Sequence, residues 1–439
     1  MTTLTTSTTQ QPDNAKLTTP TTRQREADNL DNSKLTTPNL ELRTSNIKPR
    51  TTPPLLIPFN KPFLTGHELD YIREAVALGK ISGNGEFTLR CQEFFEQRYG
   101  FQKCLLTTSC TDALEMAAIL LDIQAGDEVI LPSFTFVSSA NAFVLRGAKI
   151  VFVDSQADHP NLDASLLEGL ITTKTKAIVV VHYGGLACEM DQIMEIADRH
   201  GLFVVEDAAQ AIDSFYKGKA LGGIGHLGCF SFHETKNIQC GEGGMLTINH
   251  PDFVKRAEII WEKGTNRAAF FRGEIDKYGW VDVGSSFLPS EVTAAFLWAQ
   301  LENLKSIQSR RIQIWNDYHG FLTNRELPKL LDLGFLELLQ LAGEGLTFSV
   351  MEKDKIANAH LFYMLFESLE SRTQFAQFLK NHGVLSVFHY QSLHRSQVAQ
   401  RHFPDQYQRQ LPNSDKFSDC LLRLPFFFEL GEMSKLIVT

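Results

Sequence analysis

A lysine and an aspartate that could act on one substrate each follow a short apolar segment of the chain. Asp207 comes directly after Leu202–Glu206, and Lys236 lies shortly beyond Gly228–Phe232. A lysine amine can form a Schiff base with an aldehyde, and a carboxylate can keep a pyridine nitrogen protonated so that the ring accepts electrons. A single lysine is usually a solvated surface group, so the interpretation depends on the pair. Together the two residues predict a site for pyridoxal 5'-phosphate (PLP).

A cluster of hydroxyl side chains could bind the phosphate of such a cofactor. The run Thr107–Asp112 follows one predicted strand and opens a predicted helix, and free N–H groups at a helix N-terminus attract a phosphate dianion. Thr111 and Asp112 are therefore candidates, with the Asp112 backbone N–H serving and its carboxylate facing away. The alternative is ordinary capping of the helix by Ser109 or Thr111.

Two further features could hold the cofactor ring. An aromatic side chain can stack on a pyridine ring and exclude water, and both Phe134 and Phe136 follow the predicted strand Glu128–Leu131. Asp207 could pair with the ring nitrogen while Gln210 binds the ring hydroxyl. The alternatives are a core position for each phenylalanine and a helix cap for the aspartate.

Other polar residues near these motifs have more than one possible role. His182 and His233 flank the same region and are as well explained by packed hydrogen bonding as by proton transfer. The run Cys240–Gly244 predicts a tight turn in which glycine permits a positive φ. Neither the G-x-G-x-x-G dinucleotide fingerprint after the first strand nor a P-loop occurs.

Basic residues further along the chain could meet a second anion, such as a nucleotide diphosphate. Two runs, Lys263–Arg267 and Phe271–Tyr278, surround a predicted loop, and arginine there could bind phosphate oxygens. A solvated loop is an equally good explanation. The run His389–His394 follows a later strand and could line the mouth of the site. The candidates for substrate binding are Arg267, Arg272, Lys277 and His389.

Composition excludes several classes of protein. The 439 residues carry a formal net charge of -9, which argues against a general nucleic-acid binder. The seven cysteines contain no C-x-x-C pair, a pattern typical of reduced thiols rather than of a disulfide framework or a zinc site. There is no apolar run of about 20 residues to span a membrane and no secretory signal pattern at the N-terminus. These observations predict a cytoplasmic location.

The chain divides into three predicted parts. Residues 1–55 are rich in Thr, Asn and Pro and contain an internal repeat, so we expect a disordered tail. Residues 56–305 alternate apolar strands with amphipathic helices, which predicts a mostly parallel sheet covered by helices on both faces. Residues 306–439 form a smaller α/β domain that begins with the helix Ile307–Leu322. The expected strands of the large domain are Cys104–Thr107, Glu128–Leu131, Lys149–Val153, Ala177–Val181, Leu202–Glu206 and Gly228–Phe232; its expected helices include Asp112–Leu121, Ala164–Ile171 and Met190–His200.

These motifs together resemble those of the DegT/DnrJ/EryC1/StrS family of sugar aminotransferases. The resemblance runs from about Ile57 nearly to the C-terminus, with separated motifs in the order of the family. It implies an aspartate-aminotransferase-like fold with a seven-stranded, mostly parallel sheet, and the transfer of an amino group from L-glutamate to a nucleotide-linked keto sugar. It also implies a homodimer with shared active sites.

The resemblance gives roles to individual residues. It implies that Lys236 forms the Schiff base, that Asp207 pairs with the pyridine nitrogen and that Gln210 contacts the ring hydroxyl. Many members use an asparagine of the partner subunit at the phosphate, in a Gly-x-Asn-x-Arg motif. Here the stretch is Gly284–Leu288, so Ser286 would have to serve instead. The remaining cofactor contacts are Phe136 for stacking, and Ser231, Thr111 and Asp112 for the phosphate.

Two other functions remain open for the same fold. A PLP-dependent sugar dehydratase of this kind would carry histidine in place of lysine, and Lys236 is present. A regulator without catalytic activity would not need the lysine, the acid and the phosphate-binding residues together. Set against the family, the C-terminus is expected to end several residues before the end of the last helix, which would loosen the small domain.

Overall fold

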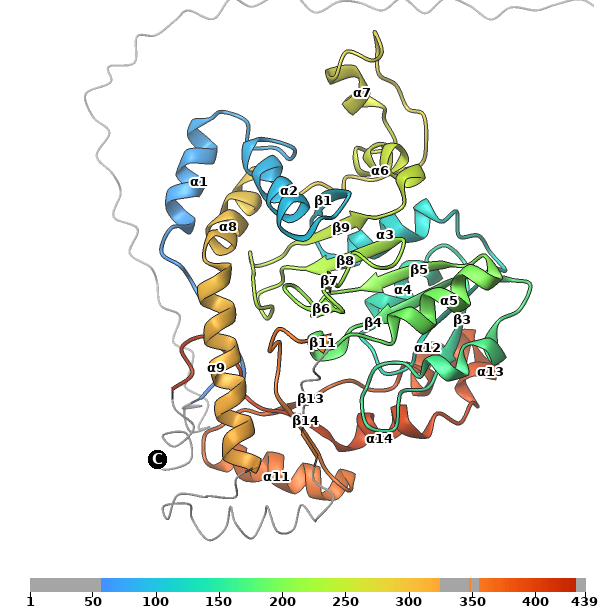
Figure 1. Ribbon diagram of the computed structural model, residues 1–439, viewed down its shortest axis with the longest axis vertical. Coiled ribbons are helices and arrows are strands. Elements are labelled where there is room, and N and C mark those ends of the chain that lie inside the picture. The colour runs from blue at the N-terminus through green and yellow to red at the C-terminus, as the bar shows by residue number, and fades with distance from the viewer. Residues whose placement is uncertain (1–56, 324–346, 349–354, 432–439) are drawn as a thin grey trace, which may run out of the picture. The chain divides into compact units, whose positions relative to one another are not determined.

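The computed structural model describes residues 57–323, 347–348 and 355–431 (Figure 1). The predicted tail at 1–55 and the C-terminal end at 432–439 lie outside the described residues. All described residues belong to one compact unit, Pro53–Thr439. Because no division is found within this unit, the domain boundary expected between residues 305 and 306 stays a prediction. No helix within the described ranges is long and apolar enough to cross a membrane.

A seven-stranded sheet forms the centre of the unit, in the order β1-β9-β8-β5-β4-β2-β3. All neighbours pair in parallel except β9, which is antiparallel to both β1 and β8. The strands are short, apolar and almost entirely buried, because helices cover both faces of the sheet (Figure 1). The predicted sheet is confirmed, and it contains one strand, β9, that was not predicted. The strands are β1 Lys103–Thr107, β2 Glu128–Pro132, β3 Lys149–Val153, β4 Thr175–Val181, β5 Phe203–Asp207, β8 Leu227–Ser231 and β9 Gly244–Ile248.

The helices on the two faces of the sheet bury separate apolar clusters. One cluster takes in α2, α5 and α8, and the other takes in α3, α4 and α6. The helix predicted at Ala164–Ile171 is wrong, because this segment forms two short 3-10 turns, η1 Ala164–Leu166 and η2 Glu168–Leu170. The helices of this part are α1 Glu68–Ala77, α2 Glu86–Tyr99, α3 Cys110–Leu120, α4 Ser138–Val144, α5 Met190–His200, α6 Val254–Trp261, α7 Arg267–Phe271 and α8 Glu291–Glu302.

The C-terminal part contains a second, smaller sheet in the order β10-β12-β14-β13. The long helix α9 (Leu304–Thr323) and the helix α11 (Leu369–Asn381) contribute to its apolar core. A three-stranded sheet, β11-β6-β7, joins this part to the segment after β5. The remaining strands are β6 Phe215–Tyr216, β7 Lys219–Ala220, β10 Thr347–Phe348, β11 Lys355–Ile356, β12 Tyr363–Leu365, β13 Val387–Phe388 and β14 Leu421–Arg423; the remaining helices are α12 Gln397–His402, α13 Pro404–Tyr407 and α14 Pro412–Cys420, with 3-10 turns η3 Tyr183–Gly185, η4 Pro251–Phe253 and η5 Leu393–Arg395.

Candidate active site

A cavity of about 670 Å³ lies at the carboxyl ends of β2, β4, β5 and β8. In parallel α/β sheets, ligands bind just beyond the carboxyl ends of the strands, between the loops that follow them. The C-terminal part closes one side through residues 388–391, which follow or end β13. Of the residues predicted from the sequence, those that line this cavity are Thr111, Phe136, Asp207, Gln210, Ser231, Lys236 and His389.

Lys236 enters the cavity from the loop after β8. Its backbone N–H donates to the carbonyl of His233 at 2.9 Å, which fixes the turn that carries it. Burial lowers the pKa of the Lys236 amine, and the nearby Cys110 and Asp207 oppose this effect only in part. A lowered pKa favours the neutral amine, which is the nucleophilic form of lysine.

Asp207 is the last residue of β5 and faces the same cavity. Its Oδ2 accepts a hydrogen bond from the Ser139 hydroxyl at 2.6 Å, and its Oδ1 accepts one from the Ala209 N–H at 3.2 Å. Burial raises the pKa of Asp207, while these two bonds and the charge of Lys236 lower it. No α-helix begins at Asp207, so the geometry does not support the alternative of a helix cap.

Glu206, the acid beside Asp207, faces the opposite side of the sheet. It is fully buried, and its carboxylate accepts the N–H groups of Gly222, Ile224 and Gly225 at 2.5 to 2.7 Å. The His182 Nε2 lies 2.9 Å from the same carboxylate. Because successive strand residues alternate between faces, the two adjacent acids have different surroundings. Glu206 and His182 therefore have a structural role beneath the site.

The phosphate end of the cavity is at the start of α3. Ser109 caps this helix, and its hydroxyl accepts the Asp112 N–H at 3.1 Å. The Asp112 N–H is thus already bonded, and the Asp112 carboxylate accepts the Thr108 hydroxyl. The geometry therefore does not support the predicted part of Asp112 in phosphate binding.

Other donors at this end are available for a phosphate. Within the described residues the N–H groups of Cys110 and Thr111 have no hydrogen-bond partner. The Thr111 hydroxyl lies 2.8 Å from the Ser138 hydroxyl, and Ser138 and Ser231 line the same cavity. Two free N–H groups and three hydroxyls fit a phosphate dianion. Ser138 was missed from the sequence because it lies at the start of a different helix.

The structure distinguishes the two candidate phenylalanines. Phe136 lines the cavity with 55% of its surface exposed, whereas Phe134 is 1% exposed and packs in the core. Gln210 Oε1 accepts the Gly184 N–H at 2.7 Å, and Gln210 Nε2 donates to the Tyr390 hydroxyl at 3.0 Å. One N–H of the Gln210 amide is left for a ring hydroxyl.

His389 and Tyr390 line one side of the cavity, and the ring of Tyr183 packs against both of them. We call these three residues the aromatic wall. The rings of His389 and Tyr390 stack at 3.8 Å, and the Tyr183 hydroxyl lies 3.2 Å from His389 Nδ1. Burial, together with the positive charges of Arg423 and Lys236, lowers the pKa of His389, which keeps its imidazole neutral. Tyr390 lies in the predicted run His389–His394 but was not singled out.

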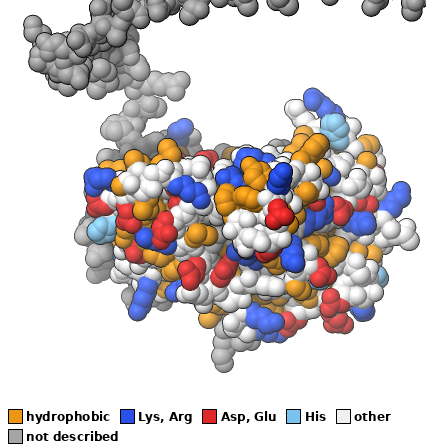
Figure 2. Space-filling model, turned by 90° about the horizontal axis from the view of Figure 1, so that it is seen from above, with side chains coloured by type: hydrophobic (Ala, Val, Ile, Leu, Met, Phe, Trp, Pro, Cys, Tyr) orange, Lys and Arg blue, Asp and Glu red, His pale blue; other side chains and the backbone are white. Residues whose placement is uncertain are grey.

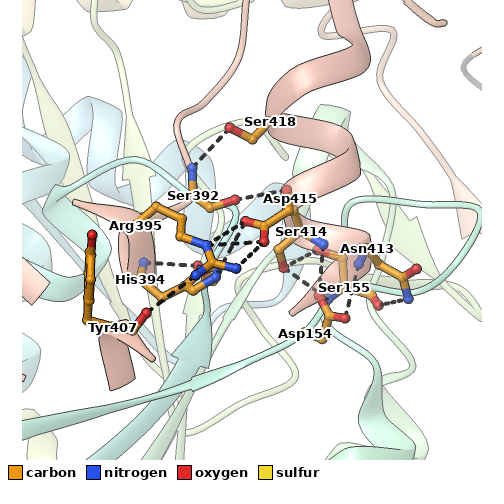
Figure 3. Close-up of polar contacts among 11 residues, drawn as sticks. Asp154, Ser155, Ser392, His394, Arg395, Tyr407, Asn413, Ser414, Asp415 and Ser418 are labelled. Carbon is orange, nitrogen blue, oxygen red and sulfur yellow. Dashed lines mark hydrogen bonds and ion pairs between the residues drawn. The ribbon is translucent and has the colours of Figure 1, made fainter. Parts of the chain in front are cut away.

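Polar contacts attach this wall to the large sheet (Figure 3). Beyond the wall, the His394 ring lies 2.6 Å from the Ser133 hydroxyl, which follows β2. The Ser414 N–H donates to Asp154 at 2.7 Å just beyond β3, and Arg395 pairs with Asp415 at 2.7 Å. The segment that follows His389 and Tyr390 is therefore bonded to residues just beyond β2 and just beyond β3.

The comparisons with known proteins agree with this geometry. The family model of the DegT/DnrJ/EryC1/StrS aminotransferases matches residues 63–437. The chain belongs to this family. The predicted family and fold are confirmed, and so is the prediction of an enzyme of the aminotransferase class.

Individual relatives are similar over most of their length. The GDP-perosamine synthase of Caulobacter vibrioides is 38% identical over 243 residues, which are 55% of this chain and 64% of that protein. The spore coat polysaccharide biosynthesis protein SpsC of Bacillus subtilis is 35% identical over 278 residues, 63% of this chain and 71% of that protein. Spr1654 of Streptococcus pneumoniae, assigned as a sugar aminotransferase, is 26% identical with a TM-score of 0.75, and the match covers 87% of this chain and 96% of that one. It was solved in PLP and PMP forms, in agreement with the predicted cofactor.

Unlike His389, the predicted substrate-binding residues Arg267, Arg272 and Lys277 do not line the cavity of their own chain. Arg267 and Arg272 line a second cavity, of about 690 Å³, beside β1 and α6. Arg272 pairs with Glu258 at 2.9 Å and with Glu274 at 2.7 Å, and Lys277 is exposed. These residues lie in and after α7, on an arm that projects from the large sheet (Figure 1).

Ser286 is also separate from the cavity of its own chain. Its side chain is exposed, although the next residue, Phe287, accepts the Thr108 N–H at 3.0 Å beside the phosphate end. Several large apolar residues of the same arm are exposed, including Phe271, Trp280 and Val283. Hydrophobic side chains gather between charged ones on the face seen from above (Figure 2).

Proposed function

We propose that this protein is a PLP-dependent aminotransferase that moves the amino group of L-glutamate to the C4 keto group of a nucleotide-linked 6-deoxy sugar. The observation that carries the proposal is the cavity in which Lys236 and Asp207 meet beside the free N–H groups of Cys110 and Thr111. We place the reaction in the cytoplasm, on the route to a cell-surface polysaccharide such as lipopolysaccharide. The relative SpsC, named for polysaccharide biosynthesis, supports this role.

The proposed substrate is dTDP-4-dehydro-6-deoxyglucose, giving dTDP-4-amino-4,6-dideoxygalactose. The runs Ser231–Asn237, Phe270–Gly273 and Val387–Tyr390 resemble those of dTDP-4-amino-4,6-dideoxygalactose transaminase. A GDP-linked keto sugar is the second candidate, because two curated relatives are named GDP-perosamine synthase. Both substrates carry a diphosphate and a C4 keto group, so the same cavity chemistry serves either.

The residues of the cavity fit the cofactor and the reaction. PLP, when bound, supplies an electron-accepting ring that is protonated at its nitrogen. Asp207 would hold that proton, and Ser139 and the Ala209 N–H orient its carboxylate. Lys236 would hold the cofactor through its amine and would also move protons within the cavity, a task that its lowered pKa suits. Phe136 and the aromatic wall of Tyr183, His389 and Tyr390 limit the access of water.

The proposed working unit is a homodimer in which each arm completes the site of the other chain. Closed two-fold pairs are the commonest assembly, and the exposed apolar residues of the arm are suited to an interface. In that arrangement Ser286 would meet the partner's phosphate. Arg267, Arg272 and Lys277 would face the nucleotide diphosphate, while His389 approaches the sugar from its own chain.

Measuring the two halves of the reaction separately tests the proposed function. We expect L-glutamate to convert the bound cofactor to its amine form, and dTDP-4-dehydro-6-deoxyglucose to convert it back. A panel with the GDP-linked keto sugar and simple 2-oxo acids identifies the acceptor. The sugar assignment is wrong if a 2-oxo acid restores the cofactor and no nucleotide-linked keto sugar does.

Complementation between damaged chains tests the shared site. We expect Ser286→Glu to lower PLP affinity at least about tenfold, because a carboxylate repels the phosphate dianion. Mixed with Lys236→Ala chains, it should recover up to about a quarter of wild-type activity, since one site of each heterodimer regains both residues. Ser285→Glu is the matched control. A fully active monomer, or no recovery from a harmful Ser286 variant, would contradict the proposal.

A further inference from the structure

A buried hydrogen bond between a serine and a histidine joins two sides of the cavity. Ser133 lies directly after β2, and His394 lies in η5, 261 residues further along the chain; neither side chain is exposed. The Ser133 hydroxyl is 2.6 Å from His394 Nδ1, and its oxygen accepts the backbone N–H of His394 at 3.2 Å. The Ser133 carbonyl accepts the N–H of Leu393 at 2.8 Å. Three contacts therefore bind η5 to the end of β2.

The donors around this bond indicate its direction. Because the Ser133 oxygen accepts the His394 N–H, its own hydrogen is available to Nδ1. The imidazole then carries its proton on Nε2, which makes no hydrogen bond but lies 3.4 Å from Asp415 Oδ1 (Figure 3). Burial lowers the pKa of His394, although the charge of Asp415 opposes this effect. The His394 ring is therefore a neutral acceptor for the Ser133 hydroxyl.

Ser133, His394 and Asp415 are the residue types of a nucleophilic triad, but their burial excludes that chemistry. Ser133 has no exposed surface and does not line the cavity, so no substrate can reach its oxygen. That oxygen is also already the acceptor of a backbone N–H. The contact instead holds two segments of the chain together.

On the side of the large sheet, Ser133 begins the segment that carries the stacking phenylalanine. Its carbonyl accepts the Thr135 N–H at 3.2 Å in addition to the N–H from η5. The Thr135 hydroxyl lies 2.9 Å from that of Ser139, which donates to Asp207. Thr135 and Phe136 both line the cavity. Ser133 is thus bonded to the residues that would orient the cofactor ring and its nitrogen.

On the side of the C-terminal part, His394 closely follows the aromatic wall. Residues on both sides of it, including Tyr390 and Ser396, line the cavity. The ring of Tyr390 is 6.0 Å from that of Phe136. The Ser133–His394 contact lies three residues before Phe136 and four residues after Tyr390. It therefore fixes the separation of the two segments that carry these rings.

A second attachment of the C-terminal part to the sheet does not reach the cavity. Beyond β3, an edge strand, the Ser414 N–H donates to Asp154 at 2.7 Å (Figure 3). The Asn413 side chain donates to the Ser155 carbonyl at 2.9 Å. None of these four residues lines the cavity. The second attachment therefore provides a comparison for the first, because it joins the same parts of the chain away from the cofactor.

We propose that Ser133 and His394 are positioning residues for the cofactor, a role that rests on the proposed aminotransferase function. Phe136 and the aromatic wall can enclose the cofactor only while their two segments keep their separation. A shift of about 1 Å in such a site can lower a rate about a hundredfold. The buried contact holds this separation from behind, so neither residue occupies space that the cofactor or the substrate needs.

Removing either partner of the contact tests this role. Ser133→Ala and His394→Ala should each raise the dissociation constant for PLP about five- to tenfold, the size expected for one lost buried hydrogen bond. The circular dichroism of the bound cofactor should weaken in both, and at saturating PLP both half-reactions should slow by similar factors. The double variant should lose no more than either single one, because the same bond is removed. His394→Asn should bind PLP within about twofold of the wild type, since its amide oxygen can replace Nδ1 as the acceptor.

Asn413→Ala is the matched control, because it removes one bond of the second attachment. It should lower the melting temperature of the apo-protein and leave PLP affinity and the dichroism unchanged. Wild-type PLP affinity in both alanine variants would overturn the proposal, since the contact would then support the fold alone. An equal loss of PLP affinity in Asn413→Ala or in His394→Asn would also overturn it. If the effects on PLP are found and no nucleotide-linked keto sugar reacts, the sugar assignment fails while the positioning role stands.

Discussion

Replacing Lys236 with alanine is expected to prevent covalent attachment of the cofactor and to lower turnover on the order of a thousandfold or more. The amine supplies both the attachment point and the group that moves protons in the cavity. The fold should survive, because the Lys236 amine forms no hydrogen bond with any described residue. Absorption of the bound cofactor, mass after borohydride reduction and the rate of transamination measure the effect.

A matched lysine separates this effect from a general loss of charge. Lys217 is exposed, pairs with Asp191 and lies over the ring of Tyr216, away from the cavity, so Lys217→Ala should keep the covalent cofactor and normal turnover. Melting curves of the two variants should be close to that of the wild type. Near-normal transamination by Lys236→Ala would show that another group carries the cofactor.

The elements that position the site could be predicted because their signals are local. Runs such as Ala177–Val181 are apolar and β-branched, and such runs are buried on both faces of a parallel sheet. The predicted helix Met190–His200 has the bounds of α5. By contrast, β9 follows the glycine-rich turn and runs antiparallel, and nothing in a five-residue segment specifies its direction. Strand direction depends on the partner strands.

The partners of the site residues could not be predicted, because they are distant in sequence. Ser139 is 68 residues from the Asp207 that it orients, and Tyr390 is 180 residues from Gln210. Such pairs are selected by packing of the whole fold. Short polar runs also have several uses: Asp112 looked available for a phosphate, but Ser109 takes its N–H.

The predicted loop around Arg267 and Arg272 shows that the role of a charged residue also depends on partners distant in sequence. The pattern around Arg267 and Arg272 is equally typical of a ligand site and of a solvated surface. The structure gives Arg272 two carboxylate partners within the chain. Arg423 was not singled out from the sequence, although its Nη2 contacts the carbonyl of Phe388, a residue that lines the cavity. Whether an arginine binds a ligand therefore depends on the groups that surround it in the fold, and the sequence does not show these groups.

Replacing Asp207 with asparagine is expected to slow turnover at least about a hundredfold, equivalent to roughly 2.7 kcal/mol of barrier. A neutral amide cannot hold the proton of the pyridine nitrogen as a carboxylate does. Asparagine can keep the bond from the Ala209 N–H through its carbonyl oxygen, and its amide NH2 can donate to the Ser139 hydroxyl oxygen, which now donates to the carboxylate. The side chain should therefore keep its position, and PLP should stay bound. The rates of both half-reactions and the affinity for PLP measure the effect.

The adjacent acid provides the control for this prediction. Glu206→Gln would turn an amide toward the N–H groups of Gly222, Ile224 and Gly225, which now donate to a buried carboxylate. We expect a loss of about 3 kcal/mol or more in the free energy of unfolding, with turnover per folded molecule much less affected than in Asp207→Asn. A rate loss below about tenfold in Asp207→Asn, about 1.4 kcal/mol, would show that another group serves the ring nitrogen. The alternating faces of β5 would then separate two structural acids, rather than one acid for folding and one for chemistry.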